Sequence, residues 1–330
     1  MKRAMIITVL AISTSWALLA DRAGAHIGTG IDSDQQGRIY FADTIRNRIW
    51  RIEADGQLIP LASDIHTNFL VVADDGNVYV VHDYFEGEFK WVVWKITPEG
   101  HMAESLRSAK LEGDVGELIT IDRHGNVYFL RQFKVLMMTP EGHVSTLTDS
   151  GWSQPRYKAW SPDGSLYVVR DNSIHKVSLN GSVSMLAGGP DGEDQFERPL
   201  SLAVDGQGNV YVADYRNRRV RKITPDGQVA TVTRSGWLWY PSGVTVAAGD
   251  VYVLEYQGDY HSWTRPVLAL VADLIGNPRV RKISPGGTVA TVVSVANERR
   301  RGIVGAAFTV GALAVFVWRI RRYKSKQRSI

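Results

Sequence analysis

One short pattern recurs along the middle of the chain: a glycine, any residue, an aliphatic residue and a tyrosine, followed by apolar residues. Six copies occur, at 37–40, 76–79, 125–128, 164–167, 208–211 and 249–252. Successive tyrosines are 39, 49, 39, 44 and 41 residues apart. A fixed period of about 40–50 residues is typical of repeat architectures, in which each repeat packs on its neighbours.

A second marker follows each copy. It is a tripeptide that ends in glycine, found at 54–56, 98–100, 140–142, 179–181, 225–227 and 285–287. Short apolar stretches flank it, such as 220–223 and 228–232, so each unit supplies about four strands. Four strands per unit at this period predict an all-β fold, a six-bladed β-propeller over residues 26–298. The alternative is two unrelated β-sandwiches, in which the tyrosine pattern and the glycine turn would not recur together six times.

The fifth unit carries a family resemblance. The segments 199–205 (PLSLAVD), 208–214 (GNVYVAD), 217–220 (NRRV) and 225–227 (PDG) resemble an NHL repeat. Residues 186–199 resemble the connection between two blades of that family, and the likeness extends over roughly 27–295. The resemblance implies a six-bladed propeller that many family members use as a binding platform and some use as an enzyme.

The N-terminus has the pattern of a secretory signal. Lys2 and Arg3 precede an apolar run over 4–20, and Ala23-Gly24-Ala25 follows it. We expect a signal peptide over 1–25, with a retained membrane anchor as the alternative.

A second apolar run lies near the C-terminus. Residues 302–318 contain no charged side chain, and basic residues flank the run on both sides. We expect one transmembrane helix over 299–320 and a basic cytoplasmic tail over 321–330. The propeller would then lie on the exported side, periplasmic or extracellular. A sorting tail that is cut off after export is the alternative.

The charge between these ends is acidic. Residues 26–298 carry a net charge of −7, which argues against nucleic acid as a partner because phosphates need a basic surface. The chain has no cysteine, so disulfides, thiolate metal sites and cysteine nucleophiles are excluded.

Candidate binding residues come from the position three after each repeat tyrosine, where the strand should reach one face of the ring. That position holds a charged or titratable residue in every unit: Asp43, His82, Arg131, Arg170, Asp214 and Glu255. They are interpreted either as a charged ring that recognises a polar ligand, or as structural groups. In the second interpretation Asp43 and Asp214 cap the following turn and pair with Arg48 and Arg219.

Aromatic residues add to the same face. The connections between units contain Trp152 and a cluster of Trp237, Trp239 and Tyr240. Exposed aromatic rings suit recognition of proteins or extended ligands; the alternative is that Trp152 and Trp237 wedge between blades. An insertion over 256–276 predicts a short apolar helix that covers the face or meets a membrane, or else an ordinary packed loop.

Two kinds of propeller enzyme, one with a divalent cation and one with zinc, need metal ligands that the sequence can be searched for. The resemblance to SMP-30/gluconolactonase-like propellers implies a divalent cation held at the starts of the innermost strands, here at Thr29, Asn68, Glu117, Arg156, Leu200 and Ser242. This set contains one carboxylate, and hard cations need several oxygens. Zinc chemistry needs clustered histidines, and the spacing of His66, His82 and His261 does not require them to meet.

We therefore expect an exported, membrane-anchored binding or scaffold module, with no cofactor, no metal and no catalytic turnover. Its partner would be a protein or an extended ligand on the loop face, and 302–318 would lie in the membrane. The alternative is a metal-dependent hydrolase or lactonase.

Overall fold

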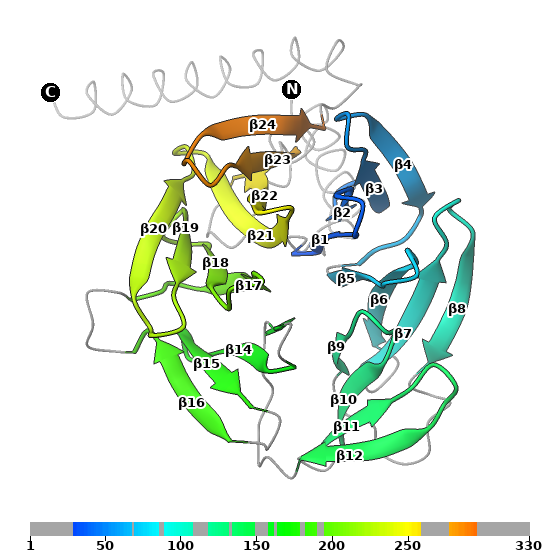
Figure 1. The fold of residues 1–330 in the computed structure, drawn as a ribbon. Helices are drawn as coiled ribbons and strands as arrows, with labels where there is room; N and C mark the ends of the chain where they lie inside the picture. Colours follow the sequence, from blue (N-terminus) through cyan, green and yellow to red (C-terminus); the bar gives the residue numbers. More distant parts are fainter. Residues whose placement is uncertain are drawn as a thin grey trace, which may run out of the picture. The chain divides into compact units, whose positions relative to one another are not determined.

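The computed structural model describes residues 29–67, 69–85, 89–107, 118–131, 134–148, 158–161, 164–178, 182–189, 195–258 and 277–295. These residues form 24 strands in six four-stranded antiparallel sheets (Figure 1). Each sheet uses four strands that are consecutive in sequence, and we call the sheets blades 1 to 6 in chain order. The predicted six-bladed β-propeller is confirmed.

The strands of the first three blades are as follows. Blade 1 contains β1 (Ile31–Ser33), β2 (Ile39–Asp43), β3 (Arg48–Ile52) and β4 (Leu58–Ser63). Blade 2 contains β5 (Phe69–Val72), β6 (Val78–Phe85), β7 (Phe89–Ile96) and β8 (Met102–Arg107). Blade 3 contains β9 (Leu118–Ile121), β10 (Val127–Arg131), β11 (Lys134–Met138) and β12 (Val144–Thr148).

The other three blades repeat this order. Blade 4 contains β13 (Lys158–Trp160), β14 (Leu166–Arg170), β15 (Ser173–Val177) and β16 (Val183–Ala187). Blade 5 contains β17 (Pro199–Val204), β18 (Val210–Asp214), β19 (Arg219–Ile223) and β20 (Val229–Arg234). Blade 6 contains β21 (Trp239–Ala247), β22 (Asp250–Gln257), β23 (Pro278–Ile283) and β24 (Val289–Ser294). In Figure 1 the first strand of each blade lies nearest the centre of the ring and the fourth lies at its rim.

The recurring glycines mark the tight turns of the blades in the described part of the chain. The glycines of the six tetrads, from Gly37 to Gly249, have φ between 77° and 83°. This left-handed region costs little for glycine and is strained for other residues. The turn between the third and fourth strands uses glycine in the same way, for example Gly227 at φ 87°. The repeat pattern is therefore a pattern of turn geometry.

The hydrophobic core lies between adjacent blades. The second strands carry most of it: all five residues of β2 and of β18 are buried. One cluster joins blades 2 and 3 through Trp91 and Phe129, whose ring centroids are 6.3 Å apart. Burial of such faces against each other is what stabilises a radial array of small sheets.

Blade 6 closes the ring against blade 1 through side-chain contacts rather than through a shared sheet. The Tyr256 hydroxyl donates to the Ala42 carbonyl at 2.8 Å, and the Arg46 guanidinium donates to the Asn277 amide oxygen at 2.8 Å. Thr245 Oγ1 donates to Asp32 Oδ1 at 3.4 Å. Contacts across this junction join the first and last parts of the ring.

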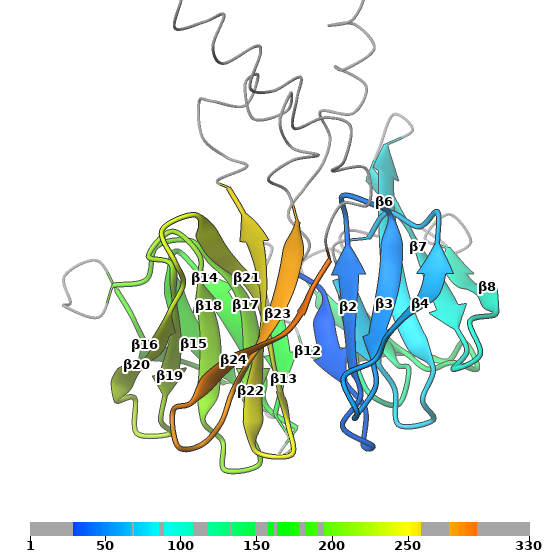
Figure 2. The same ribbon diagram turned by 90° about the horizontal axis from the view of Figure 1, so that it is seen from above.

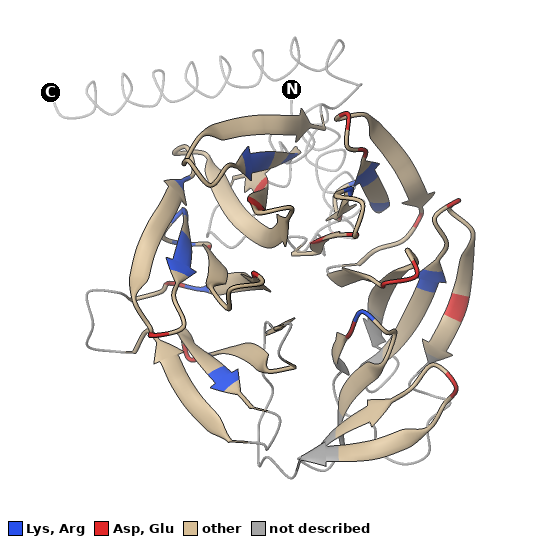
Figure 3. Ribbon diagram, viewed as in Figure 1, with Lys and Arg blue, Asp and Glu red and all other residues tan. Residues whose placement is uncertain are grey.

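The ring has two different faces. The turns between the second and third strands, and the connections between blades, lie on one side, which we call the loop face; the glycine turns lie on the other side, the turn face (Figure 2). Figure 3 shows acidic residues gathered at the turns. The turn face carries these carboxylates among the described residues: Asp34, Glu53, Asp55, Asp74, Asp75, Glu99, Asp122, Glu141, Asp205, Asp226 and Asp250.

Several predicted segments fall outside the described residues: the signal peptide, the transmembrane segment, the basic tail and residues 259–276 of the insertion. Within the described ranges the chain forms strands and turns, and none of its elements is a helix of the length and apolarity needed to cross a membrane.

Candidate binding face

Three of the predicted charged residues are buried carboxylates with fixed partners. Asp43 on β2 accepts from Arg46 Nη1 at 2.9 Å and from the backbone N–H groups of Ile45 and Arg46 at 3.1 and 3.2 Å. It therefore caps its turn, as one of the two interpretations predicted. The predicted pairing with Arg48 is wrong: that side chain lies beside the Trp50 ring, 5.7 Å from its centroid.

Asp214 occupies the same place in blade 5. Its side chain is fully buried and accepts from Arg219 Nε at 2.9 Å and from the Asn217 amide at 2.9 Å. The pairing with Arg219 is confirmed. Asp214 also accepts from the backbone N–H of Glu197 at 2.8 Å, so it fixes the connection that enters its own blade.

Glu255 has the densest set of partners. Its Oε2 accepts from Arg279 Nε at 2.6 Å, and its Oε1 accepts from Arg281 Nη2 and from Ser235 Oγ, both at 2.5 Å. The side chain is fully buried. Because Ser235 belongs to the connection between blades 5 and 6, this buried ion pair holds that connection in place.

The other members of the predicted ring have different surroundings. His82 is half-buried, with Nδ1 2.9 Å from the His66 carbonyl oxygen, and Arg170 is 63% exposed beside Asp171. Arg131 ends β10, and its side chain lies outside the described part of the structure. The six residues thus occupy equivalent strand positions, but among the described side chains three carboxylates form buried ion pairs, His82 is half-buried and Arg170 is exposed.

The aromatic cluster of the loop face lies between blades 5 and 6. Trp237 is 78% exposed, and Leu238 beside it is 38% exposed. This exposure excludes the alternative in which Trp237 wedges between blades; Trp152 lies outside the described residues. Trp239 and Tyr240 are half-buried at the base of the same segment. We call residues 235–238 the Trp237 loop.

Hydrogen bonds hold the Trp237 loop in one shape. The Ser235 N–H donates to the Arg218 carbonyl at 2.8 Å, and the Gly258 N–H donates to the Leu238 carbonyl at 2.8 Å. Arg218 Nη1 donates to the Trp237 carbonyl at 2.6 Å. The exposed indole is therefore presented by a braced backbone, which lowers the entropy cost of binding.

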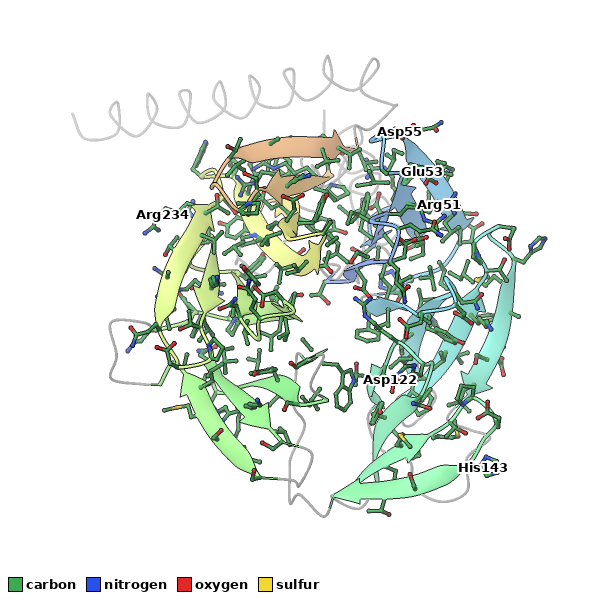
Figure 4. The ribbon with its side chains drawn as sticks, in the orientation of Figure 1. Arg51, Glu53, Asp55, Asp122, His143 and Arg234 are labelled. Carbon is green, nitrogen blue, oxygen red and sulfur yellow. The ribbon has the colours of Figure 1, made fainter. Side chains whose placement is uncertain are left out.

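Arginine side chains surround the aromatic rings. The Arg279 guanidinium lies 3.8 Å from the centroid of the Trp239 ring. Arg218 lies 6.0 Å from the centroid of Tyr240, which packs 5.0 Å from the buried ring of Tyr215. Arg234, at the outer edge of blade 5, is exposed (Figure 4). Cation–π contact of this kind combines apolar area with positive charge.

Two of the residues considered for a divalent cation do not suit one, while Thr29 is half-buried ahead of β1. Leu200 is buried and offers no side-chain oxygen, and Ser242 Oγ is buried and donates to the Leu254 carbonyl at 3.4 Å. Both lie where a register shift interrupts the pairing of the first two strands of their blades. Asn68, Glu117 and Arg156 lie outside the described residues, and so does His261. Within the described ranges no three histidine or carboxylate side chains gather as ligands for a metal ion.

Sequence reasoning missed a structural contact of the repeat tyrosine. In three blades its hydroxyl donates to an aspartate six residues earlier: Tyr40 to Asp34 at 3.0 Å, Tyr128 to Asp122 at 2.9 Å, and Tyr211 to Asp205 at 3.3 Å. The signal was present as an aspartate at a constant spacing before the tyrosine. Burial, with the adjacent carboxylate, raises the pKa of Tyr40 and of Tyr211 to about 12.

Asp32 is a second residue that the repeat analysis passed over. From β1 it accepts from the Val72 N–H of blade 2 at 2.9 Å, and Arg123 Nη2 of blade 3 lies 3.6 Å away. Thr245 of blade 6 donates to it as well. Burial raises the pKa of Asp32, opposed by the charge of Arg123. This carboxylate connects four blades near the centre of the ring.

Comparison with known proteins agrees with this architecture. The NHL repeat model matches residues 196–223, which include β17 and β18 and reach the end of β19. Teneurin-1 of Homo sapiens is 21% identical over 231 residues, which cover 58% of this chain and 8% of that protein. Teneurin-4 of Mus musculus is 24% identical over 236 residues, again 8% of its length. The chain is thus similar to a small part of these much longer relatives.

Solved structures share the fold at low identity. A gluconolactonase of Xanthomonas campestris superposes with a TM-score of 0.51 at 17% identity, covering 70% of this chain and 83% of that one. A calcium-binding regucalcin of Agrobacterium tumefaciens gives 0.50 at 14% identity, covering 74% and 86%. At these identities the likeness concerns the fold alone. The chain is a six-bladed β-propeller in which residues 196–223 match the NHL repeat.

Proposed function

We propose that this chain is an exported, membrane-anchored propeller whose loop face binds a partner protein or an extended ligand. The anchor is the apolar run over 302–318, and the tail over 321–330 lies in the cytoplasm. The proposal assigns no reaction, because Leu200 and Ser242 do not suit a cation and the loop face offers rings and arginines instead.

The observation that carries the proposal is the exposed indole of Trp237 on a braced loop. A tryptophan that is 78% exposed loses much of the hydrophobic free energy that burial would give. The loop is fixed at its two ends and at the Trp237 carbonyl. Ser235 at its start also donates a hydrogen bond to the buried Glu255 carboxylate. Rigid aromatic residues surrounded by arginine have the composition of binding hot spots.

Site-specific photo-crosslinking in native membranes tests the proposal. A photoreactive phenylalanine analogue replaces Trp237 in the full chain, and a matched variant carries it at Met185, which is 60% exposed on the outermost strand of blade 4. We expect crosslinked products from position 237, to a protein or to lipid, and none from position 185. Equal crosslinking at both positions, or none at position 237, would reject the loop face as the binding surface.

A further inference from the structure

We infer that the ligand of the loop face is the headgroup layer of the membrane that anchors the chain, and that the Trp237 loop enters that layer. This inference rests on the proposed membrane anchor and names the surface that the loop face binds. Three separate features support it: the position where the described propeller ends, the charge of its two faces, and the chemistry of the Trp237 loop.

The first feature is the length of chain between the propeller and the apolar run. Within each blade the fourth strand runs toward the loop face, so β24 ends at Ser294 on that side (Figure 2). Seven residues, 295–301, separate this point from the run at 302–318. Even fully extended, they span at most about 25 Å.

That span favours one orientation of the ring. If the turn face met the membrane, the connecting chain would first have to run back along β24, which has six residues and is about 20 Å long at roughly 3.3 Å per residue. Little chain would remain to reach the bilayer. With the loop face toward the membrane, the whole connection is available.

The second feature is the difference in charge between the two faces. On the loop face the carboxylates Asp43, Asp214 and Glu255 are buried and paired, whereas Asp171 and Glu197 are exposed beside Arg170 and Arg216. Arg234, which ends β20 directly before the Trp237 loop, is exposed. The turns of the opposite face carry a row of carboxylates (Figure 3). Lipid phosphates attract guanidinium groups and repel carboxylates, so the loop face is the complementary side.

The third feature is the kind of residue at the tip. Tryptophan and tyrosine are enriched where proteins meet the headgroup region, because an amphipathic ring suits that boundary. Trp237 and Leu238 project from the loop, and Tyr240 and Trp239 lie beneath them beside Arg218 and Arg279. Arg279 and Arg218 hold this segment through Glu255 and the Trp237 carbonyl, and the exposed Arg234 at the start of the same connection is the guanidinium that faces solvent.

The absence of cysteine from the sequence allows a direct test with single environment-sensitive labels. The full chain is reconstituted into vesicles of phosphatidylcholine, with or without phosphatidylglycerol, and carries one fluorophore through Leu238→Cys. The matched control carries it through Asp226→Cys, in the exposed turn between β19 and β20 on the turn face. Flotation of the vesicles after alkaline extraction measures anchoring independently of the label.

We expect the label at position 238 to shift to shorter wavelength and to lose aqueous iodide quenching by about threefold or more relative to position 226. Adding Trp237→Ala should restore quenching at position 238. Phosphatidylglycerol should protect the label at position 238 further. Salt at 1 M should weaken this extra protection, because the Debye length falls to about 3 Å.

The outcomes separate the two proposals. If the chain fails to float, the membrane anchor and this inference both fall. If it floats while the label at 238 stays as quenched as the label at 226, the anchor stands and the inference is overturned. Protection of position 238 that occurs in native membranes but not in lipid vesicles would also overturn it, in favour of a protein partner.

Discussion

Gly243 on β21 tests whether blade 6 packs against blade 1 as described. A Cβ added there would lie 2.7 Å from the Thr29 carbonyl oxygen, 2.7 Å from Ile31 Cγ2 and 3.3 Å from Leu254 Cβ. Real Cβ atoms essentially never approach neighbours closer than 3.0 Å. Two of these contacts belong to blade 1, so Gly243→Ala must push the two blades apart.

The expected cost follows from overpacking of a close contact. Inserting a methyl group into a well-packed site costs about 1–3 kcal/mol, and each kcal/mol lowers the unfolding midpoint of a domain of this size by roughly 2–4 °C. We therefore expect Gly243→Ala to unfold several degrees below the parent chain, measured by far-ultraviolet circular dichroism during heating.

Gly206 provides the matched control. It lies in the turn between β17 and β18, has no positive φ, and an added Cβ would meet nothing within 4 Å. Gly206→Ala should leave the midpoint unchanged or raise it slightly, since alanine restricts the unfolded chain. If Gly243→Ala and Gly206→Ala unfold at the same temperature, the close approach of blade 6 to blade 1 is wrong.

Three further predictions concern ionisable groups. Glu255→Ala should lower the free energy of unfolding in urea by about 3–5 kcal/mol, because two arginines lose their buried partner. Lys282→Ala breaks the more exposed Lys282–Asp250 pair and should cost under about 1 kcal/mol. Equal losses in the two variants would refute this difference between the buried and the exposed pair. Tyr211 has a folded pKa of about 12 against 10.0 in the unfolded chain, so its contribution to stability is lost as pH rises between these values, and Tyr211→Phe should show a shallower alkaline fall than the parent. Burial raises the pKa of Asp32 above its ordinary value of 3.8, so the parent loses stability as pH rises through the folded pKa. Asp32→Asn should therefore gain in urea midpoint relative to the parent as pH rises above about 4, and a constant difference would count against the burial of this carboxylate.

The blade count was predictable because it depends on local turn geometry. Each Gly–x–aliphatic–Tyr copy contains a glycine with positive φ and begins a buried second strand. Both properties depend only on residues that are adjacent in the sequence. The pairing of Asp214 with Arg219 was predictable for the same reason: the two residues are opposite each other across one tight turn.

Contacts that depend on side-chain direction were harder to predict. Asp43 and Arg48 are also opposite each other in the ladder, yet Arg48 packs on Trp50 and Arg46 reaches the carboxylate from within the turn. Glu255 takes a partner from the connection between blades, and the spacing of the sequence does not define that approach.

The exposure of Trp237 could not be read from the sequence either. A tryptophan in a connection between blades is equally compatible with a wedge in the core and with a ring in solvent. The outcome depends on the bonds from Arg218 and Gly258, which turn the segment outward. Sequence therefore located the aromatic cluster, and the three-dimensional arrangement shows which ring is exposed to solvent.

Accessibility of the two faces in native membranes tests most directly whether the loop face is the one that binds. The full chain carries a single cysteine at position 238 or at position 226, and a membrane-impermeant maleimide is added from the side that exposes the propeller. The account predicts rapid labelling at position 226 and strong protection at position 238, lost when detergent removes the membrane and its proteins. Equal labelling at the two positions before detergent, or protection at position 226 alone, would contradict it.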